Sequence, residues 1–364
     1  MHVSEIETPA IAVDLDVFER NLTRAADYAK AHQLRLRPHT KTHKSSVIAR
    51  MQLELGAAGL TVAKVGEAEV MLRAEPADLL VAYPVIGERK LRRLLEVARH
   101  AQVTVALDSL EAAQGLSDAA AKAGMEIGVL VEEDVGLGRV GLTDSHQLVT
   151  LATSIAKLPA LRLRGFNFYP GQVKAIDADG LAKFHAVNAA LEETATLWRA
   201  AGLPLEVISG GSTPTLFHSH ELPLMNEIRP GTYVFNDRNT IESGAATLAD
   251  CAAHVLVTVV STSRASGMIV DGGSKTFSSD RLSTGGEVTF GLLREAPEAK
   301  FVKMNEEHGY IDLPAASRHF RIGDRVRILP NHICVAVNLH ERVYGIRGEE
   351  VEQIWEIEAR GKLQ

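Results

Sequence analysis

Short apolar runs alternate with longer segments of helical periodicity from about residue 9 to residue 235. This alternation is typical of the strands and crossover helices of a parallel sheet. The expected strands are 10–13, 35–38, 60–63, 79–82, 103–107, 127–131, 164–168 and 207–209. The expected helices are 16–32, 44–55, 65–74, 88–100, 109–124, 144–157 and 177–201. The first two thirds of the chain are therefore expected to form an α/β domain.

Eight β-α units of this size would close the sheet into a barrel. The strand at 10–13 is expected to precede the barrel rather than to be one of its strands, because it directly precedes a helix that reaches His32. A pairing segment near 227–229 would complete the eight strands. We therefore predict a (β/α)8 TIM-type barrel with its active site at the C-terminal ends of the strands. A doubly wound open sheet is the alternative that the pattern leaves open.

The pattern of apolar and polar residues changes after about residue 240. Short runs rich in β-branched residues follow one another, with turn residues between them and little helical periodicity. These runs are AHVLVTVVSTS, GMIVDGG, RVRILP, ICVAVNLH, RVYGIR and VEQIWEIEAR. We predict that residues 1–238 form the α/β barrel and residues 239–364 a small, mainly antiparallel β domain.

Composition narrows the classes of function. The chain has 364 residues, 46% of them apolar, which suits two globular domains. Its net charge of −7 argues against binding nucleic acid, which requires clustered Lys and Arg. The apolar runs are far shorter than the roughly 20 residues that cross a bilayer. Two cysteines, and an acidic first segment without a signal pattern, favour a cytoplasmic protein whose partners are small molecules or its own copies.

The segment from Leu36 to Lys44, LRPHTKTHK, is the first candidate for chemistry. It follows an expected barrel strand, where catalytic residues gather. A lysine can attack a carbonyl cofactor once neighbouring cations or desolvation lower its pKa. The positive charges needed for this could come from Arg37, His39, His43 and Lys44. A basic loop that is only solvated surface is the alternative.

Two later segments have the composition of a phosphate site. In Val207 to Thr213, VISGGST, a strand opens into glycines and hydroxyls that could offer donors to a dianion. It falls near the loops that bind phosphate in many (β/α)8 barrels. The segment from Arg229 to Tyr233 could close the same pocket with the tyrosine hydroxyl as a donor. A plain strand-to-helix turn is the alternative.

The stretch from Gly136 to Gly141 matches GxGxxG. The dinucleotide fingerprint belongs to the first β-α turn, whereas this match follows the sixth strand, so a nicotinamide site is not expected. Arg139 in this loop could face a cofactor ring. Alternatively, Arg139 forms a salt bridge with one of the acidic residues at 132–134.

His332 and Cys334 lie two residues apart in the sequence PNHIC. If the segment is a strand, both side chains lie on one face and could bind the same ion. Imidazole and thiolate ligands suit Zn²⁺, with water or substrate in the open positions. A buried free cysteine beside a hydrogen-bonded histidine is the alternative.

Taken together, these stretches resemble the D-threonine aldolase and D-serine dehydratase family. Members of this family are relatives of alanine racemase that use pyridoxal 5'-phosphate (PLP) on a fold-type III barrel. The resemblance covers nearly the whole chain. It is carried by TPAIAVDLD, RPHTKTHK, GLTVAKVGEAEVM, EEDVGLGRVG, ISGGSTPT, EIRPGTYVFND, VDGGSKTFSSD, MNEEHGY, LPNHICVAVNLH and VEQIWEIEARGK.

The resemblance implies that Lys41 is the catalytic lysine that binds PLP. It implies that His332 and Cys334 hold a divalent metal ion (Zn, Mn or Mg), that the substrate is a β-hydroxy D-amino acid, and that the chain forms a homodimer. The cofactor-binding residues expected with Lys41 are His39, Arg139, Tyr169, Ser209, Gly210, Gly211, Ser212, Thr213 and Tyr233.

The resemblance leaves two reaction types to be distinguished, aldol cleavage and dehydration. Aldolases of the family usually carry Asp where Cys334 stands, and Tyr-His-Gly where this chain reads Tyr169-Pro170-Gly171, both of which favour a dehydratase. The closing segments resemble the aldolase branch. We therefore expect Cα–Cβ cleavage to glycine and an aldehyde, with dehydration of D-serine or D-3-hydroxyaspartate as the alternative. An amino-acid racemase would need a second base opposite Lys41, and the PLP carriers of this fold type lack a β domain.

Overall fold

The computed structural model of the chain describes residues 1–284 and 287–364. By spatial contacts the chain forms two compact units, each discontinuous in sequence. The barrel unit comprises residues 24–41, 46–231 and 362–364, and the β unit comprises residues 1–23, 42–45 and 232–361. The expected domains were continuous, 1–238 and 239–364. In the structure the chain leaves the barrel unit after Lys41 for four residues and then returns to it.

The barrel unit contains the predicted eight parallel strands. They are β2 (Arg35–Leu36), β3 (Leu60–Val62), β4 (Asp78–Val81), β5 (Gln102–Leu107), β6 (Ile127–Glu133), β7 (Leu161–Phe168), β8 (Val207–Gly210) and β9 (Glu227–Ile228). Their order is β2-β9-β8-β7-β6-β5-β4-β3. A parallel bridge between His39 and Thr61 joins the segment after β2 to β3 and so closes the ring. The barrel and its eighth strand at β9 are thus confirmed.

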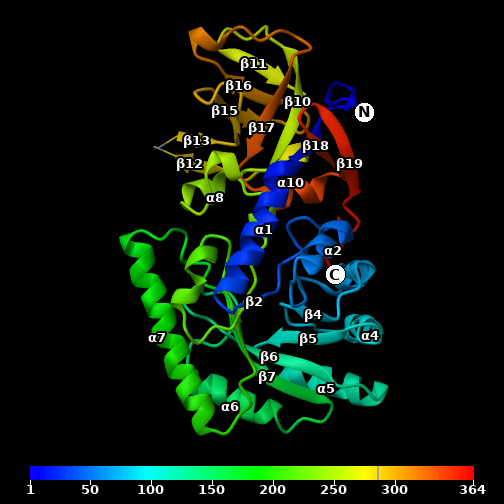
Figure 1. Cartoon of the computed structure of the whole chain (residues 1–364), viewed down its shortest axis with the longest axis vertical. Helices are drawn as coiled ribbons and strands as arrows, with labels where there is room; N and C mark the ends of the chain where they lie inside the picture. The colour runs from blue at the N-terminus through cyan, green and yellow to red at the C-terminus, as the bar shows by residue number, and fades with distance from the viewer. Residues whose placement is uncertain (285–286) are drawn as a thin grey trace. The chain divides into compact units, whose positions relative to one another are not determined.

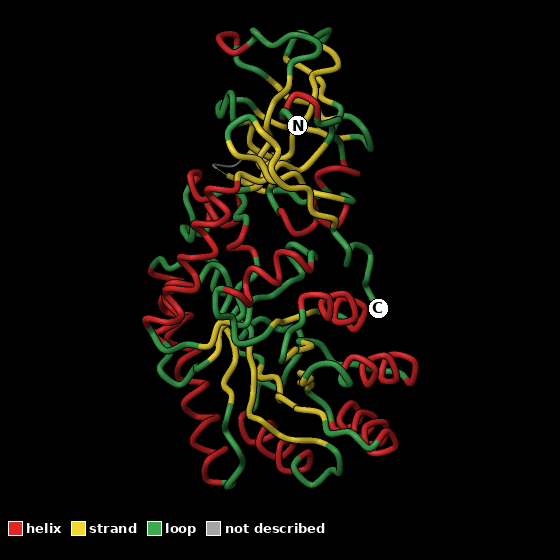
Figure 2. Tube along the Cα trace, turned by 45° about the vertical axis from the view of Figure 1, so that its right-hand side comes forward, coloured by secondary structure: helices red, strands yellow, loops and turns green. Residues whose placement is uncertain are grey.

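Helices follow the strands of this unit and lie outside them (Figure 2). They are α2 (Ser46–Glu54), α3 (Val65–Met71), α4 (Glu88–Val97), α5 (Leu110–Ala123), α6 (Ser145–Ile155) and α7 (Ala178–Ala200). The predicted ends of α5 are confirmed, because the Ser109 hydroxyl accepts from Ala112 N and Gly124 follows the helix at a φ of 65°. These caps fix where α5 begins and ends.

The β unit is built on a nine-stranded sheet, which Figure 1 draws with β10, β11 and β15 to β19. Its strands are β1 (Ala10–Asp14), β10 (Ala253–Ser261), β11 (Gly267–Val270), β14 (Gly291–Leu293), β15 (Lys300–Met304), β16 (Gly309–Asp312), β17 (Arg325–Pro330), β18 (Arg342–Arg347) and β19 (Glu350–Glu356). Strands β12 (Leu282–Thr284) and β13 (Glu287–Thr289) pair antiparallel in a separate two-stranded sheet. All pairs in the large sheet are antiparallel except β1 with β18. The mainly antiparallel character is therefore confirmed.

Strand β1 stays outside the barrel, as expected, because it pairs with β10 and β18. The helix that follows, α1 (Leu15–Ala31), starts in the β unit and ends in the barrel unit. Within the β unit, Phe18 on α1 packs with Phe235 and Trp355 at ring-centre distances of 6.0 and 5.3 Å. These buried rings fasten the N-terminal segment to the C-terminal sheet.

The prediction that ICVAVNLH forms a strand is wrong. Residues Ile333–Leu339 form helix α10, and His332 is its extended N-cap residue. The buried residues Ile333, Ala336 and Val337 follow helical spacing. The Asp237 carboxylate accepts from Ile333 N at 3.0 Å, and this contact satisfies a donor at the helix start. The β-branched residues pointed to a strand, but a cap from a distant segment stabilises a helix.

Among the described residues, no helix is long and apolar enough to cross a membrane.

Candidate functional site

Lys41 lies just beyond the bridge that closes the barrel, at the C-terminal side of β2. Its backbone N–H donates to His39 Nδ1 at 3.4 Å. Its Nζ lies 5.9 Å from the centre of the Tyr169 ring, and the guanidinium carbon of Arg139 lies 5.0 Å from the same ring. Three residues that were predicted to bind the cofactor, on segments after β2, β6 and β7, therefore meet around one aromatic ring.

Arg139 stands on a loop that an aspartate shapes. Both carboxylate oxygens of Asp134 accept backbone N–H groups, at distances of 2.8 to 3.1 Å from Gly136, Leu137 and Gly138. These amides therefore stabilise the conformation of the loop itself.

Arg139 also approaches a buried carboxylate. Its Nη2 lies 4.0 Å from Glu132 Oε1, so the ion-pair alternative holds together with the contact to Tyr169. Burial raises the pKa of Glu132, and Arg229, Asn167 and Arg139 partly offset that effect. Arg139 is half exposed, so this ion pair contributes little to stability and leaves the guanidinium accessible.

The loop after β8 has the form expected of a phosphate cradle. A Cβ at Gly210 would stand 2.3 Å from the Phe168 ring, and Gly211 has a φ of +80°, so both positions favour glycine. Ser212 and Thr213 are largely buried. The Ser212 hydroxyl lies 3.1 Å from Thr215 Oγ1. The bare backbone and the neighbouring hydroxyls suit an anion such as the phosphate of PLP.

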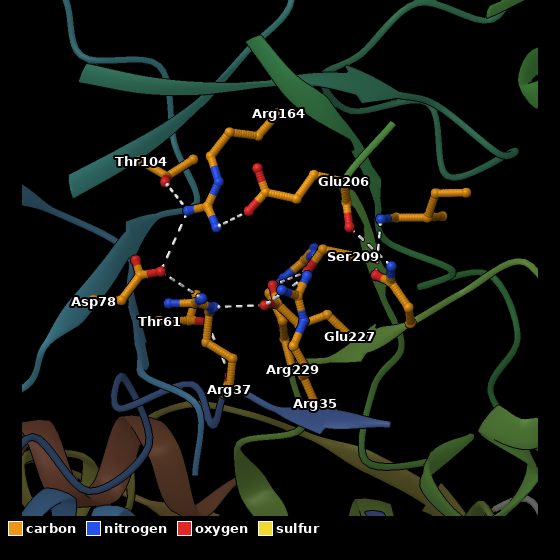
Figure 3. A network of polar contacts seen from close by, with 12 residues as sticks. Arg35, Arg37, Thr61, Asp78, Thr104, Arg164, Glu206, Ser209, Glu227 and Arg229 are labelled. Atoms are coloured by element: carbon orange, nitrogen blue, oxygen red, sulfur yellow. Dashed lines mark hydrogen bonds and ion pairs between the residues drawn. The ribbon is translucent and has the colours of Figure 1, made fainter. Parts of the chain in front are cut away.

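Ser209 has a different environment from its neighbours in the cradle (Figure 3). Its fully buried hydroxyl donates to Glu227 Oε1 at 2.7 Å and accepts from Arg229 Nη1 at 2.7 Å. Arg229 also donates through Nη2 to Phe168 O at 2.9 Å, and its backbone N–H donates to Gly210 O at 2.9 Å. The Ser209 side chain thus supports the cradle from inside the barrel.

Arg37 belongs to the same interior network (Figure 3). Its guanidinium lies 3.0 Å from Asp78 and 2.9 Å from Glu227, and these carboxylates raise its pKa although burial opposes them. Two carboxylates therefore balance this charge, and Arg37 is not a source of positive field for Lys41 as the sequence had suggested. His43 and Lys44 are buried in the β unit.

Tyr233 lies in the short 3₁₀ helix η4 (Thr232–Val234) and is buried. It belongs to the β unit, whereas Gly210, Gly211, Ser212 and Thr213 belong to the barrel unit. Its part in phosphate binding stays a prediction.

The candidate metal ligands lie at the start of α10. His332 Nδ1 is 3.1 Å from Asp280 Oδ2. Cys334 Sγ is 3.2 Å from Thr42 Oγ1 and 3.6 Å from Thr232 Oγ1. His332 and Cys334 are hydrogen-bonded to each other, so the structure brings the pair together although they lie on a helix.

The mutual hydrogen bond changes the protonation of both groups. It raises the pKa of His332 to about 9, against the effect of burial. Burial raises the pKa of the Cys334 thiol, but the hydrogen bond and positive charge of His332 and the hydrogen bond with Thr42 together outweigh burial, so the pKa is lowered. The lowered pKa makes it easier for Cys334 to form the thiolate, which is the form that binds metals.

The donor set fits a catalytic metal ion. Within 1–284 and 287–364, no group of three or more His, Cys, Asp or Glu side chains is arranged to hold an ion. His332 and Cys334 would thus supply two ligands and leave positions for water or substrate, as catalytic sites do. An imidazole and a thiolate suit Zn²⁺ better than Mg²⁺.

Three neighbours of this pair were missed from the sequence: Thr42, Asp237 and Asp280. Each lies far from His332 and Cys334 along the chain, and Asp280 is separated from His332 by 52 positions. The segment VDGGSKTFSSD, which contains Asp280, was among those that carry the resemblance, and this was the available signal.

Comparisons with known proteins give a consistent result. The sequence model of the alanine racemase N-terminal domain matches residues 13–239, and that of a serine dehydratase domain matches residues 252–346. A 3-hydroxy-D-aspartate aldolase of Paracoccus denitrificans (strain Pd 1222) is 34% identical, over 100% of this chain and 94% of its own.

Two solved structures are similar over nearly their whole length. D-threonine aldolase from Filomicrobium marinum has a TM-score of 0.91 and 31% identity, with 99% of this chain and 97% of the other covered. D-threo-3-hydroxyaspartate dehydratase from Delftia sp. HT23 has a TM-score of 0.89 and 30% identity, with 98% of each covered. The chain therefore belongs to the family of D-threonine aldolases and D-serine dehydratases, whose N-terminal domain is of the alanine racemase type.

Proposed function

We propose that this chain is a lyase that uses PLP and a divalent metal ion to cleave β-hydroxy D-amino acids to glycine and an aldehyde. The observation that carries the proposal is the grouping of Lys41 and Arg139 around the Tyr169 ring, at 5.9 and 5.0 Å from its centre. Nearby cations favour a neutral, nucleophilic lysine. The names of the full-length relatives, two aldolases and a dehydratase of hydroxy D-amino acids, support lyase chemistry.

The barrel unit would supply the cofactor site. PLP provides an electron sink for a bond broken at the substrate Cα. Lys41 would hold the cofactor covalently and carry a proton at Cα. The loop of Gly210, Gly211, Ser212 and Thr213 would bind the phosphate through amides and hydroxyls. Arg139 would face the cofactor ring from the aspartate-shaped loop.

The start of α10 would supply the metal site. A divalent ion held there would act as a Lewis acid on the β-hydroxyl of the substrate. His332 and Cys334 would hold it, and the lowered pKa of Cys334 supports this role because a ligating thiol must lose its proton. Zn²⁺, Mn²⁺ and Mg²⁺ are the ions to compare.

Dehydration is the second candidate, and Cys334 favours it. The Delftia dehydratase is 30% identical, and a cysteine-to-alanine variant of a D-threo-3-hydroxyaspartate dehydratase, also 30% identical, has been solved in a metal-free form. Pro170 stands where aldolases of the family are expected to carry an acid-base histidine. In this reaction Lys41 would remove the Cα proton, and hydroxide would leave from Cβ. The 34% identity to an aldolase over the whole chain supports cleavage instead.

We also propose a cytoplasmic homodimer. The family resemblance supports the dimer, and the low cysteine content supports a reducing compartment. Sedimentation of the purified full chain would test the assembly, because a monomer at working concentration would contradict it.

The reaction proposal is tested by product analysis. The full chain is incubated with PLP, with Mn²⁺ or Zn²⁺, and separately with D-threonine, D-serine and D-3-hydroxyaspartate. We expect glycine and an aldehyde from the D-isomers of the β-hydroxy acids. Equal turnover of L-threonine would contradict the stereochemical part, and interconversion of isomers without cleavage would indicate a racemase.

A further inference from the structure

Asp280 is held beside His332 by two contacts, one from its side chain and one from its backbone. Its Oδ2 lies 3.1 Å from His332 Nδ1. Its backbone oxygen accepts from Asn331 Nδ2 at 3.0 Å, and Asn331 directly precedes His332. The segment that carries Asp280 is therefore tied to the residue before the histidine as well as to the histidine ring.

Asn331 is itself rigidly placed. It is buried, its Oδ1 accepts from Arg238 Nη1 at 2.9 Å, and its Nδ2 also donates to Thr289 O at 2.7 Å. Arg238 Nη1 further lies 2.6 Å from Thr289 Oγ1. A buried amide with all these contacts has one orientation, so the position of Asp280 beside the ring is defined by the fold rather than by a chance surface contact.

From this geometry we propose that Asp280 is a positioning residue of the metal centre, acting through His332; the inference rests on the proposed metal-dependent function. An ionised carboxylate only accepts hydrogen bonds, so Nδ1 must carry the proton. Nε2 is then the nitrogen that would lose its proton and bind the ion. Asp280 selects the tautomer and fixes the ring plane, as carboxylates do behind many metal-binding histidines.

Asp280 is proposed to orient the His332 ring rather than to stabilise the fold. The side chains of His332 and Asp280 are 40% and 43% exposed, and a pair exposed to that degree contributes little to the free energy of unfolding. Asp237, the other nearby carboxylate, already accepts from Ile333 N and Thr240 N.

The test compares metal affinity in full-length, PLP-loaded variants. Asp280→Ala removes the acceptor, and Asp280→Asn keeps an oxygen that can accept from Nδ1–H. Glu349→Gln is the matched control, since Glu349 makes the same kind of carboxylate–imidazole contact, 3.1 Å from Nε2 of His2, and lies outside α10. Zn²⁺ affinity is measured by competition with a chromophoric chelator. Co²⁺ is then added to saturation, and the thiolate-to-cobalt absorption is recorded.

We expect Asp280→Ala to weaken Zn²⁺ binding by about 10- to 100-fold. Asp280→Asn should lose less, and Glu349→Gln should match the native chain. The cobalt–thiolate band should persist in Asp280→Ala at saturation and vanish in Cys334→Ala. If Asp280→Ala does not fold, Asp280→Asn decides, because it should still bind Zn²⁺ measurably less tightly than the native chain.

Two results would overturn the inference. Native Zn²⁺ affinity in both Asp280 variants would show that the carboxylate does not position the ring. Loss of binding as complete as in His332→Ala, with no cobalt band, would make Asp280 a ligand. Failure of the metal site itself is distinguishable, because His332→Ala would then retain a full equivalent of Zn²⁺.

Discussion

The Cys334 thiol lies 3.2 Å from the Thr42 hydroxyl, 292 positions away in the sequence. Thr42 is the residue that follows Lys41. It belongs to the segment 42–45, which is part of the β unit although the residues on both sides of it are part of the barrel unit. The same segment is anchored at Lys44, whose carbonyl accepts from Ala359 N at 3.0 Å. The segment after the candidate cofactor lysine is therefore part of the packing around the candidate metal ligand.

We predict that His332→Ala and Cys334→Ala each lose the metal ion and nearly all activity, because either change leaves one protein ligand. The effects should not add, since both residues serve one ion, and the double variant should be about as poor as either single one. Metal content by elemental analysis checks this. The visible absorption of bound PLP should stay unchanged, and a full metal equivalent in the double variant would refute the site.

Lys41→Ala should abolish the visible absorption of covalently bound PLP and nearly all turnover. No other described lysine is placed at the Tyr169 ring together with Arg139. Lys64→Ala is the matched control, because Lys64 Nζ lies over the Tyr83 ring at 3.5 Å. The assignment is wrong if the Lys64 variant, rather than the Lys41 variant, loses the absorption band.

Ser209→Ala should destabilise the barrel more than it weakens PLP binding. It removes the hydroxyl that both Glu227 and Arg229 contact at 2.7 Å, and a buried charged group that loses a partner costs about 1–3 kcal/mol. Ser212→Ala should show the opposite pattern. Denaturant titration and PLP titration of both variants check the contrast, which equal losses of PLP affinity would contradict.

A buried carboxylate should make stability depend on pH. Burial raises the pKa of Glu133 to about 7, although the Thr194 hydroxyl at 2.9 Å opposes the shift. The folded-state pKa exceeds the ordinary value of 4.5, so this contribution to stability is complete below pH 4.5 and is lost as the pH rises through about 7.

Glu133→Gln should therefore gain stability relative to the native chain over that interval, by an amount on the order of 3 kcal/mol. The free energies of unfolding of both proteins, measured from pH 4.5 to 8, check this prediction. Glu192→Gln on the exposed face of α7 is the control. A stability difference that does not change with pH would contradict the assignment.

Local patterns predicted most of the barrel. Strand β1 and strand β9 were expected in their observed roles, and the expected helix 109–124 matches α5 and its caps, because periodicity and caps depend on neighbours in sequence. Helix α10 was missed because its start is stabilised by Asp237, which lies 96 positions away. No short-range rule anticipates such a contact.

The candidate site was likewise predicted from the sequence only in part. Lys41, Arg139 and Tyr169 were each predicted, and the structure brings them together. Ser209 was expected at the cofactor, but its hydroxyl is engaged by Glu227 and Arg229, which follow it by 18 and 20 positions. Residue types revealed which groups could react, while long-range packing decided which of them support the others.

The most direct test of the central claim is to identify the products from D-threonine with the PLP- and metal-loaded full chain. The proposed cleavage predicts glycine and acetaldehyde in equal amounts, with no ammonia above the background of a Lys41→Ala sample. Ammonia and 2-oxobutanoate accounting for all turnover, with no glycine, would contradict aldol cleavage and establish the dehydratase reaction instead.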